Sequence, residues 1–334
     1  MRNLLFLLCV LLIVSCKAQK DITEVNPENY AKFIKPQSLK NKLYTFASDE
    51  FEGRDTGKPG QKKAAAYLKN FYQSIGVKSP LGEDDYYQDI PSSFFNDRLP
   101  NSENVVAFIE GDGSTEEILV LSAHYDHLGI KGEDIYNGAD DDGSGTIALT
   151  EIAKAFKEAE NDGYQPKRGI LFLHVTGEEK GLLGSLYYSK NPIFPIENTV
   201  ADLNTDMIGR VDDRHKDNPN YVYLIGSDRL STELHELSEV INDKYVQLDL
   251  DYKYNAKDDP NRFYYRSDHY NFAKFDIPVI FYFNGTHEDY HQPTDTPDKI
   301  NYELLAKRAK LIFYTAWEIA NRDERPYVDK PTKK

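Results

Sequence analysis

Clusters of histidine and carboxylate side chains follow the apolar segments of this 334-residue sequence. Imidazole and carboxylate groups are good ligands for zinc and similar divalent ions. Two ions a few ångströms apart would also need a carboxylate that bridges them. The sequence therefore indicates a hydrolytic site that holds two divalent ions. The clusters are His124-Tyr125-Asp126-His127, residues 137–145, Glu178-Glu179, Asn204-Thr205-Asp206, and the loop with His287, Asp289 and His291.

The segments that would position these clusters alternate between strand-like and helix-like patterns. Continuous apolar runs at 118–123 and 170–175 are typical of strands buried on both faces of a parallel sheet. Between them, Leu149, Ile152 and Phe156 recur at helical spacing, which predicts a strand–helix–strand unit with a helix over 145–159. Further strands are predicted at 104–109, 200–205, 221–225 and 277–283, and further helices at 61–75, 230–243 and 301–320.

This alternation predicts an α/β fold with a mostly parallel, twisted sheet and helices on both faces. In such folds, ligands bind beyond the carboxyl ends of the strands. Four of the five clusters directly follow a predicted strand, and the fifth leads into the helix after the first of these strands. We therefore expect all five to converge at one edge of the sheet.

Composition excludes other kinds of site. Cys9 and Cys16 are the two cysteines, and both precede the predicted elements, so a metal site would depend on histidine and carboxylate ligands. The formal charge of −15 argues against nucleic acid as a partner, because phosphate binding needs clustered lysine and arginine.

The N-terminus has the pattern of an export signal. Arg2 precedes an apolar run at 4–14, which is shorter than the roughly 20 residues that a membrane-spanning helix needs. The ending Ile13-Val14-Ser15-Cys16 resembles a bacterial lipobox, in which the cysteine becomes the lipidated first residue. An ordinary signal peptide is the alternative. We expect an exported lipoprotein on the periplasmic or cell-surface side, held at a membrane only through Cys16.

These patterns divide the chain into four parts. Residues 1–16 would be the signal peptide with its lipobox, and residues 17–37 a polar tether. Residues 38–322 would form one folded domain, and residues 323–334 a polar tail.

Five motifs follow one another along the chain: His124-x-Asp126, Asn137-Gly138-Ala139-Asp140-Asp141, Gly177-Glu178-Glu179-x-Gly181-x-x-Gly184-Ser185, Asn204-x-Asp206-Met207-Ile208-Gly209 and His291-x-x-x-Asp295-Thr296-Pro297. In this order they resemble the M28 family of zinc peptidases, which includes bacterial leucyl-type aminopeptidases. The chain also resembles this family upstream, at 48–54 and 57–60, and downstream at Ser267-Asp268-His269. The resemblance implies the architecture of the phosphorylase/hydrolase-like zinc exopeptidases.

The resemblance implies two Zn²⁺ ions and gives each matched position a role. His124 and Asp206 would hold one ion, and Glu179 and His291 the other. Asp140 would bridge both ions. Cobalt or manganese could replace zinc at such ligands.

Three further residues would complete the site that the resemblance implies. Asp126 would orient the His124 imidazole. Glu178 would be the general base, taking a proton from water that bridges the zinc ions and passing it to the departing amine. Tyr264 matches a position that donates a hydrogen bond to the tetrahedral oxyanion. The expected function is therefore an aminopeptidase acting on peptide substrates.

Other functions are compatible with the same fold. One is a glutaminyl-cyclase-like acyltransferase with one zinc ion, and another is a non-catalytic binding module. The full ligand set and Glu178 favour hydrolysis, while carboxypeptidase or dipeptidase action and the preferred substrate residue stay open.

Several polar residues near the motifs receive no catalytic role. His127, His269 and His287 are expected to line the site, whereas His174 lies inside an apolar strand and is expected in the core or behind a ligand. Asp142 and Ser144 would cap the following helix.

Overall fold

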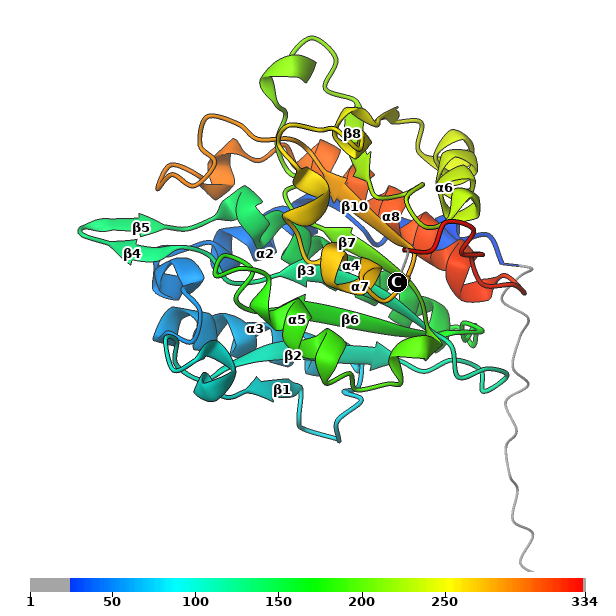
Figure 1. Cartoon of the computed structure of the whole chain (residues 1–334), viewed down its shortest axis with the longest axis horizontal. Helices are drawn as coiled ribbons and strands as arrows, with labels where there is room; N and C mark the ends of the chain where they lie inside the picture. Colours follow the sequence, from blue (N-terminus) through cyan, green and yellow to red (C-terminus); the bar gives the residue numbers. More distant parts are fainter. Residues whose placement is uncertain (1–24, 333–334) are drawn as a thin grey trace, which may run out of the picture.

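The computed structural model describes residues 25–332, and its centre is an eight-stranded sheet (Figure 1). A two-stranded hairpin, β4 (Gly129–Lys131) and β5 (Asp134–Tyr136), projects from one end of the molecule. The strands of the main sheet are β1 (Tyr87–Ile90), β2 (Ser102–Ile109), β3 (Ile118–His124), β6 (Gly169–Val175), β7 (Thr199–Thr205), β8 (Tyr221–Ile225), β9 (Asp249–Asp251) and β10 (Val279–Phe283).

The sheet has a parallel centre with antiparallel additions at its sides. Its strand order is β1-β2-β6-β3-β7-β10-β8-β9. Strands β6, β3, β7 and β10 run parallel, whereas β2 pairs antiparallel with β6 and β8 antiparallel with β10. The expected mostly parallel α/β sheet is therefore confirmed, with mixed pairing toward its edges.

Helices cover both faces of this sheet. Helices α4 and α8 pack on β3 from one face, with α1, α2, α3 and α6 around them, while α5 and α7 lie together on the other (Figure 1). The helices are α1 (Glu28–Ala31), α2 (Pro36–Phe46), α3 (Pro59–Ile75), α4 (Gly145–Asn161), α5 (Leu183–Lys190), α6 (Thr232–Tyr245), α7 (His269–Ala273) and α8 (Tyr302–Asn321).

Strands β3 and β6 are largely apolar because both of their faces are covered. Every residue of β3 is buried. Leu119 and Leu121 belong to the core under α4 and α8, whereas Ile118 and Val120 belong to the core on the opposite face. Each such side chain contributes about 1.5–3 kcal/mol by leaving water.

The predicted strand–helix–strand unit is β3, α4 and β6. The two strands are parallel neighbours, and their register pairs His124 with Val175. On its other side β3 pairs Ser122 with Asn204 of β7. The carboxyl ends of β3, β6 and β7 therefore meet, which brings the residues that follow each strand to one place.

The folded domain begins earlier than the boundary expected at Ser38. That residue lies inside α2, and Tyr30 of the expected tether is buried, stacking on Trp317 at 5.6 Å between ring centroids. The Tyr30 hydroxyl also donates to Asp162 (3.0 Å). The expectation of a polar tether over 17–37 is therefore wrong for its described part, residues 25–37, which packs on the domain. The first half of that tether, at 17–24, lies outside the described residues.

The tail expected at 323–334 also contacts the domain where the structure describes it. The Tyr327 amide donates to Glu233 of α6 (2.8 Å), and the Lys330 amide donates to the Leu230 carbonyl (3.1 Å). The expected signal peptide and Cys16 lie outside the described residues. Across 25–332, no helix is both long and apolar enough to cross a membrane.

Candidate metal centre

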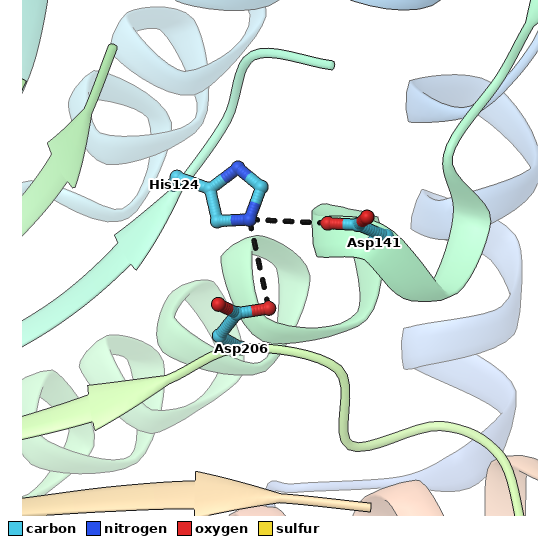
Figure 2. A group of neighbouring side chains, drawn as sticks. All are labelled: His124, Asp141 and Asp206. Carbon is cyan, nitrogen blue, oxygen red and sulfur yellow. Dashed lines mark ion pairs between the residues drawn. The ribbon is translucent and has the colours of Figure 1, made fainter. Parts of the chain in front are cut away.

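A first group of candidate ligands gathers at the end of β3. The Nε2 atom of His124 lies 3.2 Å from Asp141 Oδ1 and 3.6 Å from Asp206 Oδ1 (Figure 2). The other ring nitrogen, Nδ1, lies 3.1 Å from the carbonyl oxygen of Asp126. A neutral His124 with its proton on Nδ1 therefore donates to this carbonyl and presents the Nε2 lone pair to the carboxylates.

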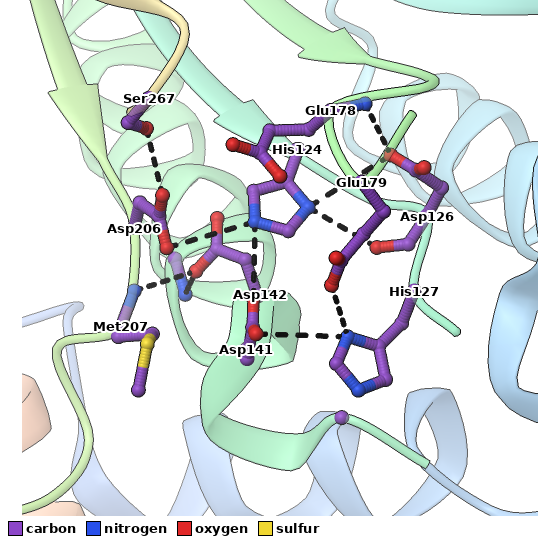
Figure 3. A network of polar contacts seen from close by, with 12 residues as sticks. His124, Asp126, His127, Asp141, Asp142, Glu178, Glu179, Asp206, Met207 and Ser267 are labelled. Atoms are coloured by element: carbon purple, nitrogen blue, oxygen red, sulfur yellow. Dashed lines mark hydrogen bonds and ion pairs between the residues drawn. The ribbon is translucent and has the colours of Figure 1, made fainter. Parts of the chain in front are cut away.

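A second group shares Asp141 with the first. His291 Nε2 lies 3.1 Å from Asp141 Oδ2 and 3.4 Å from Glu179 Oε2. His127 approaches the same carboxylates, with its Nδ1 2.8 Å from Glu179 Oε1 and 3.8 Å from Asp141 Oδ2 (Figure 3). Asp141 thus offers one oxygen to each group, which is the arrangement that a bridging carboxylate needs.

The expected bridge, Asp140, lies apart from these groups. Its carboxylate accepts the Gly209 amide at Oδ1 (2.7 Å) and lies 3.1 Å from His287 Nε2 at Oδ2. The physical reason is backbone conformation: Asp141 is extended (φ −101°, ψ 98°), so adjacent side chains leave the loop in different directions. The position expected for Asp140 is therefore held by Asp141.

The loop that carries Asp141 is fixed by a buried carboxylate from another segment. Asp295 accepts the backbone amides of Asp140 (3.0 Å) and Asp141 (3.1 Å). Asp295 follows His291 by four residues, so one short segment supplies a candidate ligand and also holds the loop of the shared carboxylate.

The donor atoms fit a pair of zinc ions. Tetrahedral zinc with bonds of about 2.1 Å places its ligand atoms roughly 3.4 Å apart. The four distances from His124 and His291 to their carboxylates are 3.1–3.6 Å. Within 25–332, buried donor atoms of both groups lack a hydrogen-bond partner, namely His124 Nε2, His127 Nδ1, Asp141 Oδ2 and Glu179 Oε1. Buried polar atoms are normally paired, so this concentration indicates room for cations.

Electrostatics supports the same conclusion. Burial alone would lower the pKa of His124, but Glu178, Asp206 and Asp141 raise it well above its ordinary value. Burial would likewise lower the pKa of His291, whereas Asp141 and Glu179 raise it to about 10. The raised pKa values show that negative charge is in excess at the site. Either protons on these imidazoles or bound divalent cations would neutralise it.

Glu178 stands beside the candidate ligands without joining either group. Its half-buried side chain extends over the His124 ring toward Asp206 (Figure 3). Burial raises the pKa of Glu178 well above its ordinary value, Asp206, Asp268 and Glu179 raise it further, and His124 opposes the rise. A carboxyl group with a raised pKa near candidate metal ligands is a candidate for proton transfer.

Asp126 contacts both His124 and the loop that carries Glu178. Its backbone oxygen faces His124 Nδ1, whereas its carboxylate lies 3.8 Å from that atom. The carboxylate instead accepts the Glu178 amide (3.1 Å) and the Thr56 hydroxyl (2.8 Å). The orientation of His124 therefore depends on the main chain of Asp126, and the side chain holds the Glu178 loop.

The expected oxyanion donor, Tyr264, lies in a different environment. Its ring sits under the Arg229 guanidinium (4.6 Å) and faces the rings of His269 and Tyr270. Tyr290 is the tyrosine that stacks on His291, with ring centroids 3.9 Å apart. A small cavity next to the ligands is lined by Asp141, Glu178, Asp206, Met207, Phe263, Arg266, Phe281, Phe283, Thr286, Tyr290 and His291.

The other histidines lie outside the cavity. His287 Nε2 is 3.1 Å from Asp140 Oδ2 and His269 is buried against Phe281, so neither lines the cavity, although the sequence predicted both to line the site. His174 is a core residue whose Nε2 lies 2.7 Å from the Tyr72 hydroxyl. The sequence motifs predicted no ligand role for Asp141, and they predicted for His127 only that it lines the site. Their adjacency to Asp140 and Asp126 was the available indication, but spacing alone does not tell neighbouring side chains apart.

Comparison with known proteins identifies the family and the fold of the chain. The sequence model of peptidase family M28 matches residues 104–316 of the chain. A protein of Arthroderma otae named "probable leucine aminopeptidase" is 30% identical over 216 residues, which are 62% of this chain and 56% of that protein. The solved structure of the Legionella pneumophila LapA aminopeptidase matches with a TM-score of 0.70 and 24% identity, covering 97% of this chain and 81% of that one.

A solved glutaminyl cyclase of Bacteroides thetaiotaomicron also matches, with a TM-score of 0.63 and 17% identity, over 85% of this chain and 98% of that one. At these identities the structural matches establish the fold alone. An aminopeptidase and a cyclase share it, so the fold does not choose between their reactions. The chain spans 50–60% of the length of the curated relatives that it matches first.

Proposed function

Because the chain belongs to peptidase family M28, we propose that it is a zinc-dependent exopeptidase that removes N-terminal residues from peptides. The observation that carries this proposal is the position of Asp141 between two groups of candidate ligands, with Glu178 beside them. A shared carboxylate supports two neighbouring ions, and an adjacent carboxyl group supports proton transfer.

The proposed ligand set differs from the expectation at one position. His124, Asp206 and Asp141 would hold one zinc ion, and Asp141, Glu179 and His291 the other. When bound, the ions would lower the pKa of water and polarise the substrate carbonyl. The side chains of this set are buried or half-buried, so their charges act on a substrate through little intervening water.

Glu178 would act as the general base in this reaction. Its carboxylate would take a proton from the attacking water and donate it to the amine that leaves. The chain positions Glu178 through its backbone, because its amide donates to the buried Asp126 carboxylate. Asp126 would therefore be a positioning residue for the base and, through its carbonyl oxygen, for His124.

The test compares Glu178→Gln with Glu110→Gln, a change of an exposed glutamate just past the end of β2. Zinc content and hydrolysis would be measured together, with aminoacyl substrates, N-blocked substrates and peptides beginning with glutamine. We expect Glu178→Gln to lower hydrolysis of the free-amine substrates by about 10²- to 10⁴-fold while zinc content persists. The Glu110 variant should match the native protein.

Each other outcome points to a different function. Cleavage of N-blocked substrates would indicate another peptidase class. Cyclisation of N-terminal glutamine without hydrolysis would favour the cyclase alternative, which the Bacteroides thetaiotaomicron match keeps in view. Zinc binding with neither reaction would leave a binding module.

A further inference from the structure

His127 is a buried histidine that the ligand set above does not use. Its side chain is fully buried between the end of β3 and the start of the hairpin. Its Nδ1 points at Glu179 Oε1 (2.8 Å), with Asp141 Oδ2 at 3.8 Å (Figure 3). The His127 and His291 rings meet edge to face, with centroids 5.8 Å apart. Both imidazoles thus face the same two carboxylates.

The close approach to Glu179 lacks the geometry of a hydrogen bond. Among the described residues, neither ring nitrogen of His127 has a hydrogen-bond partner, and neither has Glu179 Oε1 or Asp141 Oδ2. Leaving a buried polar group unpaired costs about 1–3 kcal/mol. Three unpaired donor atoms that face one another, all within 4.8 Å, have the arrangement of ligands around a cation.

The backbone on both sides holds the His127 ring in place. Its amide donates to the Arg54 carbonyl (3.2 Å). The buried Arg54 guanidinium donates to the carbonyls of Tyr125 (2.9 Å) and Gly138 (2.8 Å), so it joins the two chain segments that flank the ring. Gly138 has φ +53°, and a β-carbon there would lie 2.5 Å from His127 Cγ. The ring position is therefore fixed by the fold and does not depend on Glu179 alone.

We propose that His127 is a fourth protein ligand of the second ion, through Nδ1, together with Asp141, Glu179 and His291. This inference rests on the proposed function for the presence of two ions. The first ion has one imidazole and two carboxylates, whereas the second has two imidazoles and two carboxylates. The two sites are therefore unequal, and the second holds its ion more tightly because more of its ligands come from the protein.

The test measures coordination and affinity, independently of catalysis. Native protein, His127→Ala and His127→Asn would be stripped of metal and reloaded with zinc. X-ray absorption would count imidazoles per zinc, and competition with a chelator would give both dissociation constants. His174→Gln is the matched control, because it removes a buried imidazole that lies away from the carboxylates and pairs with Tyr72.

We expect the native protein to show three imidazoles per two zinc ions and His127→Ala to show two. The dissociation constant of the ion held by Asp141, Glu179 and His291 should rise on the order of 100-fold in His127→Ala. It should recover in part in His127→Asn, whose side-chain oxygen lies near the former Nδ1. The His174→Gln control should keep native coordination. Circular dichroism of the metal-free forms checks that each variant folds.

An unchanged imidazole count and an unchanged dissociation constant of the second ion in folded His127→Ala would overturn the inference and leave the proposed function intact. His127 would then be a neighbour of Glu179 that contacts no metal. A native protein that binds fewer than two zinc ions would overturn the two-ion mechanism, and this inference with it. If His127→Ala does not fold, the same comparison is made with His127→Asn.

Discussion

Polar side chains lie at both ends of strand β6, and the two ends differ in whether the rest of the chain provides hydrogen-bond partners for them. Arg168 directly precedes β6, whereas Glu178 and Glu179 follow it. Each guanidinium nitrogen of Arg168 donates within the chain: Nε to Glu117 (2.7 Å), Nη1 to the Ile319 carbonyl (2.9 Å), and Nη2 to the Asp323 carbonyl (3.0 Å). At the other end, buried imidazole and carboxylate atoms have no such partners among the residues of the described chain.

This difference separates a structural cluster from a binding site. Around Arg168, the guanidinium satisfies carbonyl groups at the end of α8, which a helix leaves without partners of its own. Around Asp141, equally buried groups stay unpaired and face one another. Because unpaired buried groups cost free energy, their concentration in one place is explained when an external ion completes them.

The strongest test of this comparison changes Asp141 and Asp140 to asparagine, one at a time. Asp141→Asn removes the shared carboxylate charge and should lower hydrolysis by at least about 1000-fold, since both ions lose a ligand. Asp140→Asn keeps an oxygen that accepts the Gly209 amide, and it should retain zinc and most activity. Zinc content by mass spectrometry and kcat/KM would be measured for both.

The reverse pattern, with zinc lost in Asp140→Asn and kept in Asp141→Asn, would restore the bridge expected from the sequence motif. Loss of zinc in both variants would show that the loop fails as a unit. The assignment of Asp141 alone would then lack support.

At the opposite end of β6, Arg168→Met should affect folding and leave the metal unchanged. Removing the guanidinium deprives Glu117 Oε2 and several carbonyl groups of their donor, although Glu117 Oε1 still lies 3.5 Å from Arg325 Nη1, while methionine fills much of the volume. We expect a loss of about 3 kcal/mol in the free energy of unfolding, measured with urea on metal-free protein. Zinc affinity of the folded variant should equal that of the native protein. A fall in zinc affinity would show that the two ends of β6 are coupled.

The same contrast explains what the sequence could predict. Runs such as 118–123 and 170–175 predict central strands because burial on both faces requires continuous apolar residues. The strand-end rule then brings together His124, Glu179, Asp206 and His291, which the structure places around Asp141. Short α5 and α7 and the hairpin escaped prediction, because segments of three to eight residues carry too few periodic positions.

Within the site, adjacent residues set the limit. Three consecutive aspartates, Asp140 to Asp142, have equal chemistry, and only the backbone decides which carboxylate faces the ligands. Asp142 accepts the Gly145 amide (2.9 Å) at the start of α4 and the Met207 amide (3.1 Å), in line with its expected capping role. The choice among the three depends on Asp295, which is distant in sequence and binds the loop amides.

His174, inside β6, lies between the two ends and makes the comparison dependent on pH. Burial lowers its pKa to about 3, from an ordinary value near 6.5 in the unfolded chain. Between these values only the unfolded chain binds the proton, so stability is lost as pH falls below about 6.5. At pH 5 the loss amounts to about 2 kcal/mol.

His174→Gln removes this proton and keeps a polar partner for Tyr72. Urea unfolding of metal-free protein would compare the variant with the native chain at pH 7 and at pH 5. The variant should be the less stable at pH 7, by about 1 kcal/mol, and should recover about 2 kcal/mol relative to the native chain at pH 5. An identical difference at both pH values would mean that His174 is protonated in the folded protein.

The smallest expected effect separates the two tyrosines near the site. Tyr290 stacks on His291, lines the cavity, and lies 3.3 Å from Arg266 Nη2 through its hydroxyl, whereas the Tyr264 ring faces Arg229. Loss of one hydroxyl near the reacting groups costs about 0.5–1.5 kcal/mol, so Tyr290→Phe should lower kcat/KM by roughly three- to tenfold. Tyr264→Phe should stay within about twofold, because the Tyr264 ring packs on Arg229 and His269 and is not among the residues that line the cavity, and a group that does not touch the substrate stabilises neither its ground state nor its transition state. A large fall in kcat with unchanged KM in Tyr264→Phe would instead mean that substrate binding turns this side chain toward the oxyanion, as the family resemblance implies.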